Sequence, residues 1–167
     1  MTGEVGWSVA AARNKPTQAV EFDLSAMVGH LLRTCQQLHV AIWTDRFPGG
    51  ITSTQFAVLH ALAHEGPLSQ TALRSKARLD RSTTADMVRR LVARRLVSQA
   101  KDPEDARRRV VRLTAAGRAL YTESTVRAAQ VNETMLAGLG EEDRAALLAL
   151  LSSLLEHHRG LLDYRED

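Results

Sequence analysis

"LDRSTTADMVRRLVARRLVSQAKDPEDARRRVVRLTAAG", residues 79–117, carries two different periodicities in succession. In its first half, five side chains fall on one side of a helix that ends near residue 95: Thr84, Val88, Leu91, Val92 and Arg95. Asp80 is placed to be the N-cap of this helix. In the second half, LVSQAK and RRVVRLT alternate in polarity on either side of DPEDA. The stretch therefore predicts a helix followed by a two-stranded hairpin.

Two shorter helices precede this stretch. Thr52, with Gln55 three residues later, resembles a capping box that opens a helix running to about His64. Ser69 is placed to cap a second helix through QTALRSKA. A helix–turn–helix followed by a β-hairpin is a winged helix, and we expect this core over about residues 50–114.

Long helices are predicted on both sides of the core. Apolar residues recur at spacings of three and four over residues 22–46, and Thr114 caps a helix that ends near LAGLG. EEDRAALLALLSSLLEHHRGLL is apolar on most of its circumference, which implies burial against more than one neighbour. We expect residues 1–20 to be a flexible arm and residues 21–167 to form one mostly α-helical (α+β) domain. Its long helices, about 22–46 and 114–162, would pack against a partner subunit.

Basic residues are concentrated in the centre of the chain. Residues 69–118 hold 14 Lys and Arg against 5 Asp and Glu, whereas the rest of the chain holds 8 against 14. A charged run is usually a solvated face, but a basic centre between acidic flanks is typical of a module that binds a polyanion. The segregation favours double-stranded nucleic acid as the partner.

The composition argues against several other classes of protein. The longest uncharged apolar run, residues 145–155, is about half of the roughly 20 residues that a membrane helix needs. The N-terminus lacks the features of a signal peptide, and the single cysteine, Cys35, excludes an internal disulfide and a cysteine-rich zinc site. We therefore expect a cytoplasmic protein without a membrane partner.

Motifs of common enzyme classes do not occur. The chain has no GxSxG, GxGxxG, phosphate-binding loop or CxxC, so we predict that it is not an enzyme and uses no cofactor. Aromatic residues make up 4% of the chain, too few for a single-strand binder that works by base stacking. A dimeric interaction module without a regulatory role is an alternative, but it would not explain the basic centre.

The helix after Asp80 has an exposed face suited to DNA. With Val88 at the centre of the buried face, a 100° step per residue places Ser82, Thr83, Asp86 and Arg90 on the far side, with Arg89 near its edge. Hydroxyls at a helix start suit phosphate contacts, and arginine can bond bidentately to guanine in the major groove. Asp86 would either accept from a cytosine amino group or orient Arg90 in a salt bridge.

The hairpin adds a second basic element. Arg107, Arg108 and Arg109 follow its turn directly and would repel one another unless an anion or Asp105 compensates their charge. An arginine at the tip of a wing has the reach to enter the narrow, negative minor groove. The helix after Asp80 and the hairpin that follows it are therefore predicted to form one basic surface.

Residues 79–117 resemble the signature region of the MarR (multiple antibiotic resistance regulator) family of winged-helix repressors. The resemblance rests on LDRSTTADMVRRL, Asp105-x-Arg107 and VRLTAAGRAL, preceded by TSTQFAVLHAL and GPLSQTAL, and it covers roughly residues 25–160. It departs from the family at Ala106, where arginine is common, and at Gly140, where serine usually caps the last helix.

The resemblance implies a sequence-specific transcriptional repressor. Such a protein binds a palindromic operator as an obligate homodimer, with dimer contacts from both terminal helices. The residues predicted to contact DNA are Ser69, Gln70, Arg81, Ser82, Thr83, Asp86, Arg89, Arg90, Asp105, Arg107, Arg108 and Arg109.

The resemblance also implies a small-molecule effector, for which an aromatic carboxylate or its thioester is the best candidate. In this family ligands sit between the long first helix, the helix after TST and the start of the helix after the wing. An aromatic surface with cationic or hydrogen-bonding groups suits a carboxylate. These elements offer His30, Arg33, His39, Trp43, Phe56 and His60.

Histidine and cysteine leave a redox- or metal-sensing repressor of the same fold as an alternative. The pairs His60–His64 and His157–His158 lack an HExxH motif and a closely spaced acidic ligand, so we predict no metal site. Cys35 falls within the apolar periodicity of the first helix, where a cysteine is usually a small buried hydrophobe.

Overall fold

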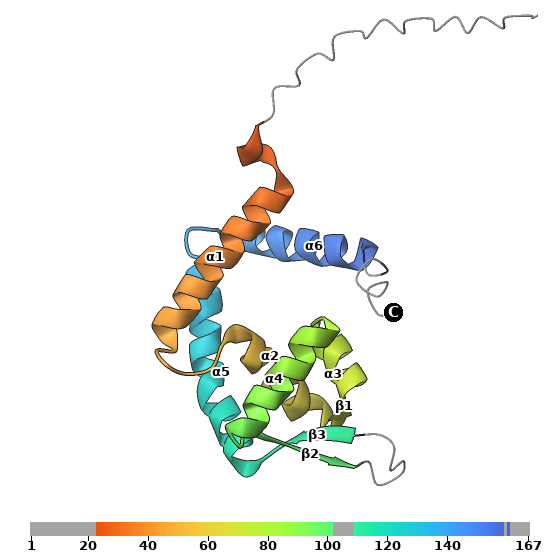
Figure 1. The fold of residues 1–167 in the computed structure, drawn as a ribbon. Helices are drawn as coiled ribbons and strands as arrows, with labels where there is room; N and C mark the ends of the chain where they lie inside the picture. Colours follow the sequence, from red (N-terminus) through yellow and green to blue (C-terminus); the bar gives the residue numbers. More distant parts are fainter. Residues whose placement is uncertain (1–22, 102–108, 159, 161–167) are drawn as a thin grey trace, which may run out of the picture.

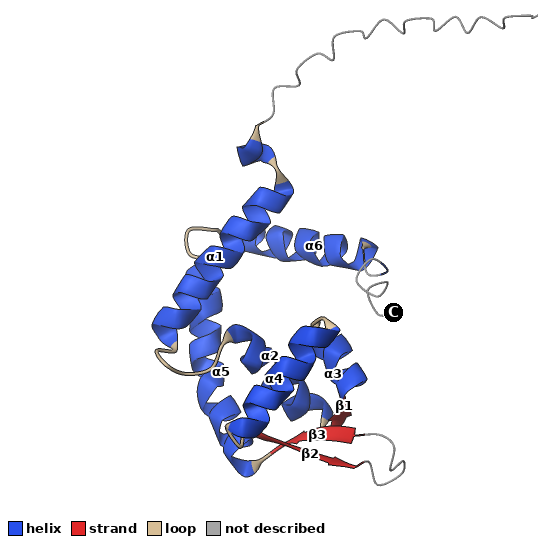
Figure 2. Ribbon diagram, in the orientation of Figure 1, coloured by secondary structure: helices blue, strands red, loops and turns tan. Residues whose placement is uncertain are grey.

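A computed structural model describes residues 23–101, 109–158 and 160. These residues form a winged-helix core below a group of long helices (Figures 1 and 2). The elements are α1 (Val28–Arg46), α2 (Ser53–Glu65), β1 (Leu68–Ser69), α3 (Gln70–Ala77), α4 (Arg81–Ala93), β2 (Val97–Lys101), β3 (Arg109–Leu113), α5 (Ala115–Met135) and α6 (Glu141–His157). The predicted fold class, mostly helical with a winged-helix core, is confirmed.

Side-chain caps set where the helices of the core begin. Thr52 and Gln55 form the predicted capping box of α2, with each side chain bonded to the other residue's backbone N–H. Ser69, Asp80 and Thr114 cap α3, α4 and α5, each by accepting a hydrogen bond from the backbone N–H three residues on. These short polar residues therefore fix the start of each helix, as the sequence predicts.

The sheet has the strand order β1-β3-β2 and is antiparallel throughout. The β2–β3 hairpin pairs Val97 with Leu113 and Lys101 with Arg109. The short strand β1 was not predicted, because two residues are too few to show an alternating pattern. Its pairing with β3 ties the start of α3 to the base of the wing.

The core of the winged helix lies between α2, α3, α4 and the sheet. Its fully buried side chains are Val58, Leu59, Leu62, Leu73, Val88, Leu91, Val97 and Val111. Thr84, Val88 and Leu91 form the buried face of α4, as predicted. The prediction was wrong for Val92 and Arg95, which are exposed. The helix ends at Ala93, and Arg95 adopts a left-handed backbone conformation with φ 58° that turns the chain into β2.

The junction between the wing and α5 is closely packed around Gly117. The Thr114 hydroxyl donates to the carbonyl oxygen of Arg95 at 2.8 Å and accepts from Gly117 N at 3.0 Å. A Cβ at Gly117 would lie 1.9 Å from the carbonyl oxygen of Leu96. Only glycine therefore allows α5 to start this close to the end of the α4–β2 turn.

The connection from α1 to α2 is built around a buried tryptophan. The ring of Trp43 stacks on Phe47 with centroids 4.5 Å apart, and its indole N–H donates to the carbonyl oxygen of Ile51 at 2.7 Å. Both rings are buried. This contact fastens the end of α1 to the chain entering the winged core.

The start of α1 differs from the prediction. Asp23 accepts hydrogen bonds from Ser25 N and Ser25 Oγ, and these local bonds favour a short 3₁₀ helix at Leu24–Ala26 instead of an α-helix. The α-helix begins only at Val28. The predicted flexible arm, residues 1–20, lies outside the described residues.

The long helices α1 and α6 expose much of their apolar surface. The expectation that Cys35 is buried was wrong for the single chain, since this side of α1 has no covering neighbour there. Helix α6 has no buried residue, so the neighbours predicted for it are not found within one chain. The large exposed hydrophobic residues of these two helices are Val28, Leu31, Leu32, Leu38, Val40, Leu147, Leu148, Leu150, Leu154 and Leu155.

None of the helices within the described ranges is long and apolar enough to cross a membrane.

Candidate nucleic-acid interface

The N-terminus of α4 is organised by an ionised carboxylate. Asp80 accepts from the Ser82 hydroxyl at 2.7 Å and from Thr83 N at 2.8 Å, and the Thr83 hydroxyl also donates to it. The hydrogen bonds from Ser82 and then Thr83 hold the pKa of Asp80 well below its ordinary value. The protons of the two predicted phosphate-binding hydroxyls are therefore directed at Asp80, and either hydroxyl must rotate before it can donate to a phosphate.

Asp86 holds two arginines on the exposed face of α4. Arg90 Nε lies 2.6 Å from Asp86 Oδ2, and Arg89 pairs with Asp86 Oδ1. Asp86 is half-buried, whereas the side chains of Arg89 and Arg90 are 79% and 64% exposed. Of the two interpretations offered by the sequence, the structure shows the salt bridge that orients Arg90. One carboxylate beside two guanidinium groups leaves a net positive charge on this face.

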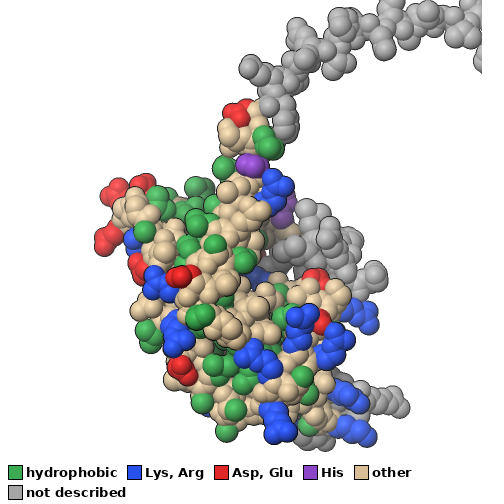
Figure 3. Space-filling model, turned by 60° about the vertical axis from the view of Figure 1, so that its left-hand side comes forward, with side chains coloured by type: hydrophobic (Ala, Val, Ile, Leu, Met, Phe, Trp, Pro, Cys, Tyr) green, Lys and Arg blue, Asp and Glu red, His purple; other side chains and the backbone are tan. Residues whose placement is uncertain are grey.

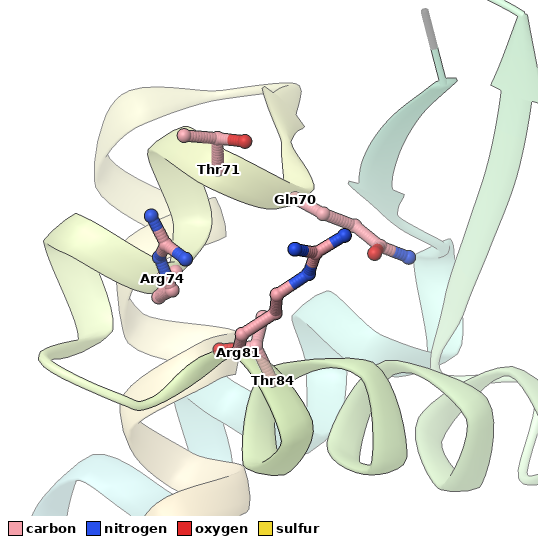
Figure 4. A pocket seen from close by; sticks show the side chains of 5 residues that line it. All are labelled: Gln70, Thr71, Arg74, Arg81 and Thr84. Atoms are coloured by element: carbon pink, nitrogen blue, oxygen red, sulfur yellow. The ribbon is translucent and has the colours of Figure 1, made fainter. Parts of the chain in front are cut away.

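A hollow lies between α3 and the first turn of α4 (Figure 4). It has a volume of about 340 Å³ and contains the predicted residues Gln70 and Arg81, which the fold brings together from two helices. Sequence reasoning missed the other lining residues, Thr71, Arg74 and Thr84. Arg74 could have been found from its position one helical turn after Gln70, since residues four apart share a face.

The base of the wing carries two cations opposite each other. Lys101 and Arg109 are paired across β2 and β3, and both are exposed. Like charges in such a pair repel each other, so an anion bound there would relieve the repulsion. Arg108, Arg107, Ala106 and Asp105 lie outside the described residues. Figure 3 shows that many of the Lys and Arg side chains on this face lie over the winged core, toward the lower right of the view.

Four of the six predicted effector-binding residues form a chain of ring contacts from α1 to α2. The centroid separations are 5.9 Å from His39 to Trp43, 5.5 Å from Trp43 to Phe56 and 6.3 Å from Phe56 to His60. The other two, His30 and Arg33, contact each other through Nδ1 and Nη2 at 3.0 Å. Arg33 precedes His39 by six residues, about 9 Å along the helix axis, so this pair lies beyond the end of the ring chain.

Tyr121 of α5 joins this group and was missed by the sequence analysis. Its ring lies 5.6 Å from that of Phe56, and its hydroxyl oxygen is 2.9 Å from both His60 Nδ1 and His64 Nε2. Partial burial lowers the pKa of His60, and the neighbouring His64 adds to this effect. The sequence did contain an indication that Tyr121 belongs to this group. Tyr121 lies two turns after the Thr114 cap, on an element expected beside the effector.

Comparison with known proteins identifies the family. The family model for the MarR family matches residues 49–108, which include α2, β1, α3, α4 and β2 of the winged core. The transcriptional repressor NicR of Pseudomonas putida is 37% identical to this chain over 142 residues, covering 84% of this chain and 90% of NicR.

Two solved structures share this fold over about four fifths of the chain. The regulator BpsR of Bordetella bronchiseptica, whose DNA binding is regulated by 6-hydroxynicotinic acid, is 36% identical with a TM-score of 0.77, covering 80% of this chain and 96% of BpsR. PcaV of Streptomyces coelicolor, solved in complex with its natural ligand, is 36% identical with a TM-score of 0.78, covering 82% of this chain and 97% of PcaV. Neither these regulators nor NicR are enzymes. The chain therefore belongs to the MarR family and is a DNA-binding transcriptional regulator.

Proposed function

We propose that this protein is a cytoplasmic homodimeric repressor that binds a palindromic operator and releases it when an aromatic acid binds beside α1 and α2. The observation that carries the proposal is the exposed Asp86–Arg89–Arg90 group on the recognition helix of a winged-helix core. An orienting carboxylate restricts the arginine rotamers before DNA arrives, so less side-chain entropy is lost on binding.

In the DNA complex, α4 enters the major groove and the wing enters the adjacent minor groove. Two recognition helices in a dimer would then engage half-sites roughly 34–36 Å apart. The described part of the interface consists of Ser69, Gln70, Arg81, Ser82, Thr83, Asp86, Arg89, Arg90 and Arg109, to which Asp105, Arg107 and Arg108 of the wing are added as predictions from the sequence.

The dimer follows from the apolar surface on α1 and α6. Five leucines of α6 are large and exposed in the single chain, an unusual density for a surface that stays in water. A second copy would cover them and would supply the second recognition helix that a palindrome requires.

The side chains of α1 and α2 and the ligand of a relative indicate the chemical class of the effector. BpsR is regulated by 6-hydroxynicotinic acid, an aromatic carboxylate. The present chain offers aromatic rings at Trp43 and Phe56 for a planar ring and His39 beside Trp43 as a hydrogen-bonding group for a carboxylate. Arg33, about 9 Å farther along α1, would supply a cation at the outer end of this site. Release of DNA requires the ligand to prefer a conformation with displaced recognition helices, by a coupling of about 1–3 kcal/mol.

The proposal is tested by selecting binding sites from a library of random duplexes with the purified protein. We expect enrichment of one inverted repeat whose half-sites are one helical turn apart. Affinity for that repeat should fall steeply as salt is raised, because phosphate contacts release counterions. A single unrepeated half-site would contradict the dimer, and the absence of any enriched sequence would contradict sequence-specific binding.

Arg90→Ala should change base preference as well as affinity. If the guanidinium group reads a base edge, its removal costs about 1–3 kcal/mol at one base pair and little at the others. Fluorescence anisotropy with the selected repeat and its single-base variants measures this pattern. Arg89→Ala is the comparison, since both arginines share Asp86 and the two patterns of loss show which of them reads a base. A loss that is equal for all operator variants would assign Arg90 to the phosphate backbone instead.

An aromatic acid should stabilise the protein and weaken its binding to the operator. A thermal-shift screen of benzoate-, cinnamate- and hydroxynicotinate-type acids and their thioesters would identify the ligand, since a ligand that binds only the folded state raises the melting temperature. Arg33→Gln should reduce this shift, because the carboxylate loses its cation. A ligand that stabilises the protein and leaves operator affinity unchanged would contradict the proposed switch.

A further inference from the structure

Two histidines of α2 and one tyrosine of α5 point their polar atoms at a common position. His60 and His64 are one helical turn apart, with ring centroids separated by 4.3 Å. His60 Nδ1 and His64 Nε2 each lie 2.9 Å from the hydroxyl oxygen of Tyr121. The ring of Tyr121 is held against Phe56, which fixes the direction of the hydroxyl.

The single hydroxyl proton of Tyr121 can be donated to only one of the two imidazoles at a time. A tyrosine hydroxyl has a single proton, so it donates to one imidazole and accepts from the N–H of the other. The histidine that accepts from the hydroxyl does so through an unprotonated ring nitrogen. Neutral imidazole nitrogens are ligands for transition metals.

The two separations from the Tyr121 oxygen to the histidine nitrogens also fit ligands of one metal ion. Bonds of about 2.0–2.1 Å from a metal to nitrogen place neighbouring ligand atoms about 2.9–3.4 Å apart, depending on whether the geometry is octahedral or tetrahedral. The two separations from the Tyr121 hydroxyl oxygen to the histidine nitrogens lie at the lower end of this range. His60 and His64 are exposed, so an ion can reach them from solvent.

We propose that His60, His64 and Tyr121 bind one divalent transition-metal ion of the Cu²⁺, Ni²⁺ or Zn²⁺ class. The two imidazoles supply nitrogen lone pairs, Tyr121 releases its hydroxyl proton to solvent and binds as phenolate, and water fills the remaining positions. Among the described residues no group of three His, Cys, Asp or Glu side chains could hold a metal, so the tyrosine is essential to the site. The fold thereby supplies the third ligand that was missing from the His60–His64 pair in the sequence.

The site joins α2 of the winged core to α5, which leads into the long helices. An ion bound there would add bonds between the two elements and would stabilise their present arrangement. This inference does not rest on the proposed aromatic effector, and it is tested with metal ions alone.

Titration calorimetry of untagged, chelator-treated full-length protein with CuCl₂ and with ZnCl₂ tests the site. We expect saturation of this site by one ion per chain, and a phenolate-to-copper charge-transfer absorption band with Cu²⁺. His60→Gln and His64→Gln should each weaken binding by at least the roughly tenfold to hundredfold that loss of a hydrogen-bonding partner of a metal ligand costs, because a ligand itself is lost. Tyr121→Phe retains the ring against Phe56 but should abolish the absorption band and weaken binding by at least about tenfold.

A control separates this site from the other histidine pair. His157→Gln with His158→Gln should leave the affinity and the absorption band unchanged, because these side chains lie at the end of α6. Circular dichroism shows whether each variant is folded. Wild-type affinity in the His60→Gln, His64→Gln double variant, or no binding by the wild type, would overturn the proposal. An unchanged affinity in Tyr121→Phe would overturn the three-ligand site.

Discussion

A Gly117→Ala variant is expected to lose about 3 kcal/mol or more of unfolding free energy, at the upper end of the range for overpacking. The new Cβ would lie 1.9 Å from the carbonyl oxygen of Leu96 and 2.9 Å from its carbonyl carbon. Both atoms belong to the backbone, so no side-chain rotation can relieve the overlap. Either α5 must move away from the turn that follows α4, or the Thr114 cap must break. Urea unfolding at a fixed protein concentration measures the loss.

Gly29→Ala provides the matched control. Gly29 lies in the first turn of α1, and an added Cβ there would meet no atom within 4 Å in the single chain. Alanine is the better helix former by about 1 kcal/mol, so this variant should be as stable as the wild type or slightly more stable. If Gly117→Ala unfolds at the wild-type urea concentration, the close approach of α5 to Leu96 is not a requirement of the fold.

Leu148→Asp combined with Leu155→Asp is expected to give a monomer whose operator affinity falls by about a hundredfold or more. The two leucines are seven residues apart on one face of α6, with exposures of 53% and 44% in the single chain. A charge at either position costs little in a monomer, where it faces water, but much in an apolar interface between two chains. Each recognition helix would then bind its half-site without help from a tethered partner. Light scattering and anisotropy with the palindromic duplex measure the two effects.

Ser153→Asp is the control for this pair. It adds a negative charge to the same helix on the side away from Leu148 and Leu155, and Ser153 is exposed. We expect it to leave both the mass and the operator affinity unchanged. A double aspartate variant that stays dimeric would show that this face of α6 does not form the interface.

The positions of the core helices could be predicted because each depends on local chemistry. The capping side chains accept hydrogen bonds from backbone N–H groups only three residues away, so their role can be predicted from the adjacent sequence. These residues are Thr52, Ser69, Asp80 and Thr114. The end of α4 was less predictable. Arg95 was assigned to the helix from its spacing, but the chain turns there because α5 and the wing must meet around Gly117, a contact between distant segments.

In the candidate site, too, local sequence predicts some features, whereas others depend on contacts between distant segments. The exposed face of α4 follows from helical periodicity, and Asp86 was expected to orient Arg90 as one of two possibilities. Periodicity could not decide between them, since only the fold shows which partner Asp86 meets. Tyr121 was missed for a related reason. Its spacing from the Thr114 cap places it near the start of α5, but it is 57 residues from His64 in sequence, and nothing local shows that the two side chains meet.

The buried Trp43 is an intrinsic fluorescence reporter at the junction between α1 and the winged core. The chain has two tryptophans, and Trp7 lies outside the described residues, so a Trp7→Phe chain would fluoresce from Trp43 alone. An indole that is shielded from water, stacked on Phe47 and hydrogen-bonded to the Ile51 carbonyl oxygen emits at a shorter wavelength than an indole in water. Any motion that separates α1 from the winged core would admit water to this ring and shift its emission to the red. Movement between the two halves of the molecule could thus be followed in real time without an attached dye.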